Sequence, residues 1–186
     1  MVDTNGLPLV FDTTCLCHFA IADRIDVLGS LPAGQVCLTT TVVIEELKRG
    51  VSKYPQLAVM ADQEWLTIER MDSSLSRLTG FISWANRIGS DPERDLGEAS
   101  VMAVAEELGA TAIIDDLSAK RIVKRYHTDV HGTRWLLAEF WRDGKLTKVG
   151  VCNLIDLLLD SGMRLPCGRG EFPDFARRKK LGPYRR

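Results

Sequence analysis

The sequence contains no long apolar run. No stretch of the 186 residues reaches the roughly 20 apolar residues that a helix needs to cross a bilayer. The first residues, MVDTNGLPLVFD, lack both the basic segment and the apolar segment of a secretory signal peptide. We therefore predict a cytoplasmic protein that does not bind membranes.

Motifs that bind nucleotide cofactors are absent as well. The chain has neither a G-x-x-x-x-G-K-[ST] loop nor a G-x-G-x-x-G turn, so a P-loop hydrolase and a Rossmann cofactor site are not supported. Histidine is scarce: His18, His127 and His131 stand apart in the sequence and have no evident serine or cysteine partner. A nucleophilic triad is therefore not predicted.

The cysteines do not indicate a disulfide framework. Their number is odd and most lie in apolar stretches, which favours reduced thiols in the core of a cytoplasmic protein. The five are Cys15, Cys17, Cys37, Cys152 and Cys167. In CLCH (15–18) the two cysteines lie two positions apart in a predicted helix and would point to different sides, so we predict no zinc site there.

Charge is distributed unevenly along the chain. The net charge is −1, but residues 167–186 carry seven Lys or Arg against two acidic residues, which leaves −6 for residues 1–166. We predict one folded domain over residues 1–166 and a basic tail over residues 167–186. The tail either contacts nucleic-acid phosphates or is a solvated, disordered terminus.

Short apolar segments alternate with helical patterns. Strands are expected at 7–12, 35–40, 65–69, 111–115 and 128–132. Helices are expected at 14–28, 41–50, 55–63, 73–89, 96–109, 118–126, 134–145 and 151–162. The alternation predicts an α/β fold with a parallel sheet, whose strands are continuously apolar because both faces are covered.

Acidic residues gather at one predicted edge of this sheet. Asp12 ends the first strand, and Asp115 and Asp116 end the fourth. The helices beside them contribute Glu45, Glu46, Asp95 and Glu98. Ligands of open parallel sheets bind outside the carboxyl ends of the strands, where these side chains are expected to meet.

Each acid also has a purely structural interpretation. Asp12 and Asp116 suit N-cap positions, Asp95 and Glu98 have the spacing of a capping box, and a helical glutamate can simply be solvated. As a group, however, several carboxylates would repel one another without a cation between them. An all-oxygen ligand set suits Mg²⁺ or Mn²⁺, and such ions commonly assist hydrolysis at phosphate.

These motifs together resemble the PIN-domain ribonucleases, the family that includes the VapC-type toxins. VFDTTCL (10–16) resembles the first family motif, and TTTVVIEELKRG (39–50) resembles the second, with Glu46 rather than Glu45 as its acid. The segment 95–122 is the most specific match: it resembles a branch with a Gly-Glu helix start and an Ile-Asp-Asp strand end. HGTRWLLAEFWRDGKL (131–146) and LIDLLLDSGMRLP (154–166) resemble its last two elements.

The resemblance implies a three-layer α/β/α sandwich with a mainly parallel sheet of four to five strands. It further implies an Mg²⁺- or Mn²⁺-dependent endoribonuclease that cleaves single-stranded RNA. Asp12 and Glu98 would bind the principal metal, and Glu46 and Asp116 would complete the pocket. Glu98 departs from the Asp that is usual in the toxins, and the basic tail lies outside the resemblance.

The resemblance also gives roles to neighbouring residues. Thr14 would hold the Asp12 carboxylate by a hydrogen bond, and Asp115 would be an alternative ligand or would support one. Lys120, Arg121 and Arg125 would contact RNA phosphates or form a solvated helix face. An antitoxin partner and a homodimer are expected, with the apolar residues near Trp65, Phe81 and Trp84 as interface or core.

Other functions fit the residues less well. A haloacid-dehalogenase-like phosphohydrolase would need an acid two positions after Asp12, where the chain has Thr14, and a receiver domain would need its paired acids near the first strand. A catalytically silent protein-binding module is the remaining alternative. Its acids would then be neutralised by Arg or Lys of a partner rather than by a metal.

Overall fold

Five parallel strands form one central sheet in the computed structural model, which describes residues 6–30, 35–88, 95–126 and 128–181. The strands are β1 (Leu9–Phe11), β2 (Cys37–Thr40), β3 (Leu66–Glu69), β4 (Thr111–Ile113) and β5 (Val130–His131). Their order is β3-β2-β1-β4-β5, and every neighbouring pair is parallel. The earliest strand of the chain is therefore the central one, which places Asp12 at the middle of the sheet edge.

The central strands are short and buried on both faces. Every residue of β1, β2 and β4 is buried, as expected for strands covered by helices on both sides. Leu9 of β1 stands opposite Cys37 of β2 on one side and Thr111 of β4 on the other. This register brings the carboxyl ends of the three strands to one edge.

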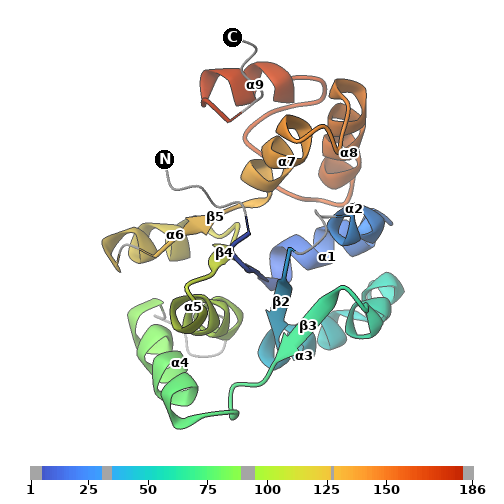
Figure 1. Cartoon of the computed structure of the whole chain (residues 1–186). Coiled ribbons are helices and arrows are strands. Elements are labelled where there is room, and N and C mark those ends of the chain that lie inside the picture. Colours follow the sequence, from blue (N-terminus) through green and yellow to red (C-terminus); the bar gives the residue numbers. More distant parts are fainter. Residues whose placement is uncertain (1–5, 31–34, 89–94, 127, 182–186) are drawn as a thin grey trace.

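Helices cover both faces of the sheet. They are α1 (Thr13–Ile21), α2 (Ile25–Gly29), α3 (Thr41–Gly50), α4 (Leu75–Ile88), α5 (Leu96–Leu108), α6 (Leu117–Val123), α7 (Thr133–Arg142), α8 (Lys148–Asp160) and α9 (Phe172–Arg178), with the 3₁₀ helices η1 (Pro55–Asp62) and η2 (Lys124–Tyr126). Figure 1 shows α1 and α2 on one side of the sheet and α4 and α5 on the other. The predicted α/β/α sandwich is confirmed. Among the described helices, none has both the length and the apolarity to cross a membrane.

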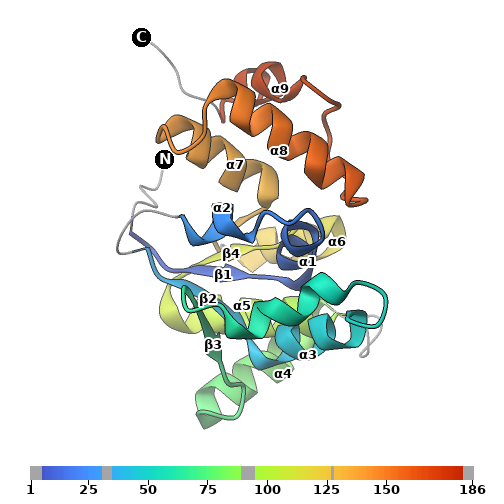
Figure 2. The same ribbon diagram turned by 90° about the vertical axis from the view of Figure 1, so that its right-hand side faces the viewer.

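The last helices stack beyond one face of this sandwich. In both views α7, α8 and α9 lie together at one end of the molecule, opposite α4 (Figures 1 and 2). The helix α9 buries Phe172 and Phe175, and the ring of Phe172 lies 6.5 Å from that of Trp141. Part of the basic segment after residue 166 is therefore folded onto α7 and α8, although the division into domain and tail stays a prediction.

Two predicted helices differ from the structure. The single helix expected at 14–28 is wrong: the chain turns between α1 and α2, where Asp23 adopts a left-handed conformation with φ of 53°. The segment expected as a helix at 55–63 is a 3₁₀ helix that begins at Pro55. Residues 31–34 and 90–94, predicted as a turn and a break, lie outside the described residues.

The aromatic residues left open between core and interface are now placed. The Trp84 side chain is fully buried, and its indole N–H donates to Glu106 over 2.7 Å, so this residue belongs to the core. Trp65 and Phe81 are half-buried and pack against the core. Trp65 meets the ring of Phe11 edge-on at 6.3 Å.

Candidate active site

Asp12 is the innermost acid of the sheet edge. It directly follows β1 and is the N-cap of α1, where its Oδ2 accepts a hydrogen bond from the Thr14 backbone N–H over 3.3 Å. The residue is only 1% exposed, and among the described residues its Oδ1 has no hydrogen-bond partner. Thr14 thus holds this carboxylate as predicted, but through its main chain. Half of the carboxylate lacks the partner that a buried polar group normally has.

Glu98 lies close enough to Asp12 to perturb its ionisation. Burial raises the pKa of Asp12 well above its usual range, and the negative charge of Glu98 raises it further, with a smaller contribution from Glu46. Burial also raises the pKa of Glu98, to about 7, with contributions from Glu46, Asp95 and Asp116. The structure therefore gathers negative charge that a proton or a cation must offset.

Glu46 is held in place by the two helices beside it. Its carboxylate accepts a hydrogen bond from the Thr13 hydroxyl at the start of α1, and one over 3.1 Å from the Gly97 backbone N–H at the start of α5. A Cβ atom on Gly97 would stand only 2.6 Å from Glu46 Oε2, so glycine is required for this close approach. Glu45, one position earlier, is exposed and pairs with Lys48 over 2.7 Å. This contrast agrees with the choice of Glu46.

The adjacent acids Asp115 and Asp116 support two different helices. Asp116 Oδ1 accepts a hydrogen bond from the Ala119 backbone N–H over 2.8 Å, inside the first turn of α6. Asp115 reaches the start of α7, where it accepts bonds from the Thr133 backbone N–H over 3.1 Å and from the Thr133 hydroxyl over 2.6 Å. The structural interpretation as a cap therefore holds for Asp116 and for Asp12.

The five predicted acids are thus brought to one edge but are not arranged alike. Within the described residues, no three His, Cys, Asp or Glu side chains form a group that could hold a metal ion. Glu46 and Asp115 instead use both carboxylate oxygens for hydrogen bonds within the chain. Asp12 Oδ1, by contrast, has no hydrogen-bond partner among the described residues and could bind a metal ion. Mg²⁺ commonly binds through only one or two carboxylates, with water and phosphate oxygens completing its coordination shell. Asp12 with Glu98 fits that mode.

A cavity of about 600 Å³ opens beside these acids. One part of its wall is acidic and includes Glu98, Asp115 and Asp116. The other part carries basic or imidazole groups and consists of His18, Lys120, Arg134 and Arg164. Thr14, Leu117 and the segment 162–166 complete the lining. An opening lined by both acids and cations suits a ligand that brings both a metal and negative charge.

The predicted RNA-binding residues divide between this cavity and the outer surface. Lys120 is half-buried, lines the cavity and stands 3.7 Å from Asp115 Oδ1. Arg121 and Arg125 are exposed and do not line it. Sequence reasoning missed Arg134 and Arg164, although both lie in segments that carried the family resemblance.

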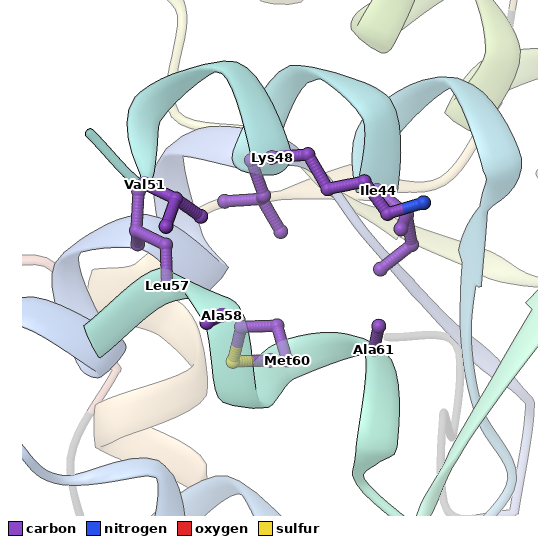
Figure 3. A pocket seen from close by; sticks show the side chains of 8 residues that line it. Ile44, Lys48, Val51, Leu57, Ala58, Met60 and Ala61 are labelled. Atoms are coloured by element: carbon purple, nitrogen blue, oxygen red, sulfur yellow. The ribbon is translucent and has the colours of Figure 1, made fainter. Parts of the chain in front are cut away.

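A second cavity lies apart from the acids. It measures about 300 Å³ and sits between α3 and η1, where Ile44, Val51, Leu57 and Met60 face one another (Figure 3). Its lining is apolar except for Lys48, and it contains no carboxylate. This cavity is therefore not a candidate for phosphate chemistry.

Comparison with known families gives one result that covers most of the chain. The family model DUF3368, described as a PIN domain, matches residues 8–169. No curated protein matches the chain. The matched range begins just before β1 and ends after α8, so it includes every residue of the site described above.

Proposed function

Because the chain belongs to the PIN-domain family, which has a nuclease-type fold, we propose that it is a metal-dependent endoribonuclease that hydrolyses phosphodiester bonds of single-stranded RNA. The observation that carries the proposal is the Asp12 carboxylate. It is buried, has an unpartnered Oδ1 within the described structure and is electrostatically coupled to Glu98. A group of this kind is stabilised by a cation rather than by water.

The proposed roles follow from the contacts of each acid. Asp12 and Glu98 would hold Mg²⁺ or Mn²⁺, while Glu46 fixes the starts of α1 and α5 through Thr13 and Gly97. Asp116 lines the same cavity and would complete the pocket through a water molecule or a second ion. When bound, a divalent cation lowers the pKa of a coordinated water and offsets charge on the phosphate.

The basic wall of the cavity would hold the RNA backbone. Lys120, Arg134 and Arg164 come from α6, α7 and the segment after α8, and all three line the cavity that the acids share. Three cations around one cavity match a substrate that carries a phosphate at every nucleotide. Arg121 and Arg125 would contact the RNA farther from the cut bond.

The biological setting belongs to the same proposal. We infer a toxin-like protein that is silenced by an antitoxin and acts as a homodimer in the cytoplasm. The alternative, a silent protein-binding module, draws support from the hydrogen bonds that occupy Glu46 and Asp115. In that case a basic side chain of the partner would neutralise Asp12 and Glu98.

Metal titration separates these two functions. Mg²⁺ and Mn²⁺ would be titrated by calorimetry into the wild type and the variants Asp12→Asn, Glu98→Gln and Glu45→Gln, beside a cleavage assay on a mixed RNA pool. We expect the wild type and Glu45→Gln to bind metal and cut RNA, and the other two variants to fold but fail at both. A wild type that binds no divalent ion at millimolar concentration would overturn the nuclease and favour the binding module.

A further inference from the structure

His18 lies in the same cavity as the acids and has a defined partner on one side of its ring. It sits on α1, is half-buried and lines the cavity together with Glu98 and Asp115. Its Nδ1 stands 2.9 Å from the hydroxyl oxygen of Ser161, the residue that ends α8. The contact ties the first helix of the chain to the segment that forms the far wall of the cavity.

The hydrogen-bond partners of Ser161 determine which imidazole nitrogen carries the proton. The Ser161 hydroxyl has one hydrogen, and it donates that hydrogen to the Leu158 carbonyl over 2.6 Å. The same oxygen can therefore only accept from His18, so Nδ1 must be the protonated nitrogen. In a neutral imidazole the other nitrogen, Nε2, then carries a lone pair and acts as an acceptor.

The surroundings of His18 favour this neutral form. Burial lowers the pKa of His18 below its usual range, and a hydrogen bond to the Ser161 backbone and the charge of Asp115 only partly offset the effect. The basic wall of the cavity carries Lys120 and Arg134, which oppose a further positive charge. His18 is therefore an acceptor in a cavity whose other basic residues are all donors.

An acceptor of this kind needs a donor on the substrate. Phosphate oxygens only accept, so they would be bound by Lys120, Arg134 and Arg164 and not by His18 Nε2. The ribose 2′-hydroxyl is the donor of RNA that lies nearest to the phosphodiester, whereas the donors of the bases lie farther out. Because His18 lines the same cavity as Glu98, the sugar next to a phosphate held in that cavity is the part of the substrate that His18 would meet.

We propose that His18 is the residue that makes this site specific for RNA, with Nε2 accepting a hydrogen bond from the 2′-hydroxyl of a nucleotide next to the cut phosphate. The inference rests on the proposed nuclease function and goes beyond it. Metal and phosphate contacts do not distinguish RNA from DNA, whereas the 2′-hydroxyl does. Ser161 is then a positioning residue, because it fixes the tautomer that exposes the lone pair.

Two substitutions at His18 distinguish the roles of the two imidazole nitrogens. Asn places an amide N–H near the position of Nδ1 and keeps the donor to Ser161, but it has no atom at Nε2. Gln places its amide near Nε2 and can still accept there. The substrates would be an RNA oligonucleotide with one cleavage site and the same oligonucleotide with a single 2′-deoxy nucleotide on either side of that site. The ratio of kcat/KM for the two substrates is the readout.

The expected ratios follow from the loss of one hydrogen bond. The wild type should prefer the all-ribose substrate by about tenfold. His18→Gln should retain most of that preference, His18→Asn should lose it, and Ser161→Ala should reduce it. Calorimetric Mn²⁺ binding should be the same in all three variants, because none of them changes Asp12 or Glu98.

Failure of this inference differs from failure of the proposed function. If the wild type cuts no RNA at all, the nuclease proposal fails. If the wild type prefers the all-ribose substrate and His18→Asn keeps that preference, His18 does not bind the 2′-hydroxyl and the inference is overturned. The nearest alternative is that His18 accepts a hydrogen bond from the exocyclic amino group of a base. A third substrate, with a base that lacks this group, tests it: if the loss of the amino group and not of the 2′-hydroxyl lowers kcat/KM, the inference is also overturned.

Discussion

Asp12 carries an energetic penalty that the rest of the fold must offset. A buried carboxylate oxygen without a partner costs about 1–3 kcal/mol, and Glu98 adds repulsion. Asp12→Asn removes the charge and keeps an oxygen for the Thr14 backbone N–H, since Asn is also a favourable N-cap. We expect the metal-free variant to be more stable than the wild type by about 1–3 kcal/mol in urea unfolding.

The exposed neighbour Glu45 supplies the control for this change. Glu45→Gln also removes one negative charge from the same edge, but its side chain faces solvent and should shift stability by less than about 0.5 kcal/mol. Added Mg²⁺ should raise the urea concentration at the unfolding midpoint of the wild type and of Glu45→Gln but not that of Asp12→Asn. A metal-free Asp12→Asn variant less stable than the wild type would show that the carboxylate is satisfied in a way the contacts do not reveal.

Gly97 tests the placement of Glu46. A methyl group there would approach Glu46 Oε2 to 2.6 Å, so Gly97→Ala must displace the carboxylate or the start of α5. We expect kcat to fall by roughly one to two orders of magnitude while the fold persists, because small displacements of positioning groups are costly to catalysis. Steady-state cleavage assays beside circular dichroism would measure both.

The matched control is a glycine in a neighbouring helix. At Gly80 in α4 the nearest atom to an added Cβ is the Ala103 Cβ at 3.8 Å, which is ordinary contact. Gly80→Ala should therefore leave cleavage unchanged and stabilise the helix by about 0.5–1 kcal/mol. Equal cleavage activity of Gly97→Ala and Gly80→Ala would show that catalysis does not depend on the position of Glu46.

At the scale of single residues, the acids of the site could be predicted from the sequence, but their hydrogen-bond partners could not. Asp12 and Glu98 could be named because strand ends and helix starts of a parallel sheet meet at one edge, whereas Glu46 was chosen over Glu45 through the family resemblance. The Thr13–Glu46 bond, the close approach at Gly97 and the His18–Ser161 bond join residues far apart in the sequence. They depend on helix packing, which no local pattern encodes.

Among the secondary-structure elements, α7 depends most on a residue outside itself. Its N-cap Gly132 has no side chain to cap it, and Asp115 supplies the acceptor from the end of the neighbouring strand β4. Asp115→Asn should destabilise the protein by about 1.5–3 kcal/mol, because it weakens charged hydrogen bonds to Thr133 and the contact with Lys120. Thermal or urea unfolding would measure the loss.

Metal binding distinguishes this capping role from that of a ligand. If Asp115 only anchors α7, calorimetric Mn²⁺ affinity should stay within about twofold of the wild type. Asp72→Asn is a suitable control, because the Asp72 pair with Arg70 is exposed and such pairs contribute about 0–1 kcal/mol. A large loss of metal affinity in Asp115→Asn would make Asp115 the alternative ligand.

The elements themselves were largely predictable, and their errors have physical causes. Continuous apolar runs identified the buried strands, and Gly109, which caps α5 in a left-handed conformation, marked its end. The break between α1 and α2 was missed because apolar spacing continues across it while the backbone reverses at Asp23. The helix α9 was missed because its surface is basic and only Phe172 and Phe175 indicate packing.

For the molecule as a whole, the clustered acids make stability depend on pH. The pKa of Glu98 is about 7 in the folded protein and near its ordinary value of 4.5 when unfolded, so the folded state binds the proton more tightly. Asp12 shifts in the same direction. The metal-free protein should therefore lose stability as pH rises from about 4.5 to 7 through Glu98, and Asp12 should add a loss in the same direction.

Divalent metal should reverse that trend. Titration of the melting temperature against pH, with and without Mg²⁺, tests this directly: stabilisation by Mg²⁺ should be small at pH 5 and should grow as pH rises past about 7, the pKa of Glu98. Asp12→Asn should weaken both pH dependences, while the contribution of Glu98, whose pKa is raised mainly by its own burial, should remain. A wild type that gains stability over this pH range in the absence of metal would contradict the coupling of Asp12 with Glu98.

The position of β1 at the centre of the sheet has a consequence for synthesis. Of the five strands, β1 leaves the ribosome before the others, yet it pairs with β4, where Leu9 meets Thr111, and the cavity also requires the segment after Ser161. Such distant pairings form late, because the intervening chain must be made and closed first. A nascent chain therefore has no complete site until the segment after Ser161 has been translated. If the finished protein cuts RNA as proposed, this chain order protects the messenger from which it is being made.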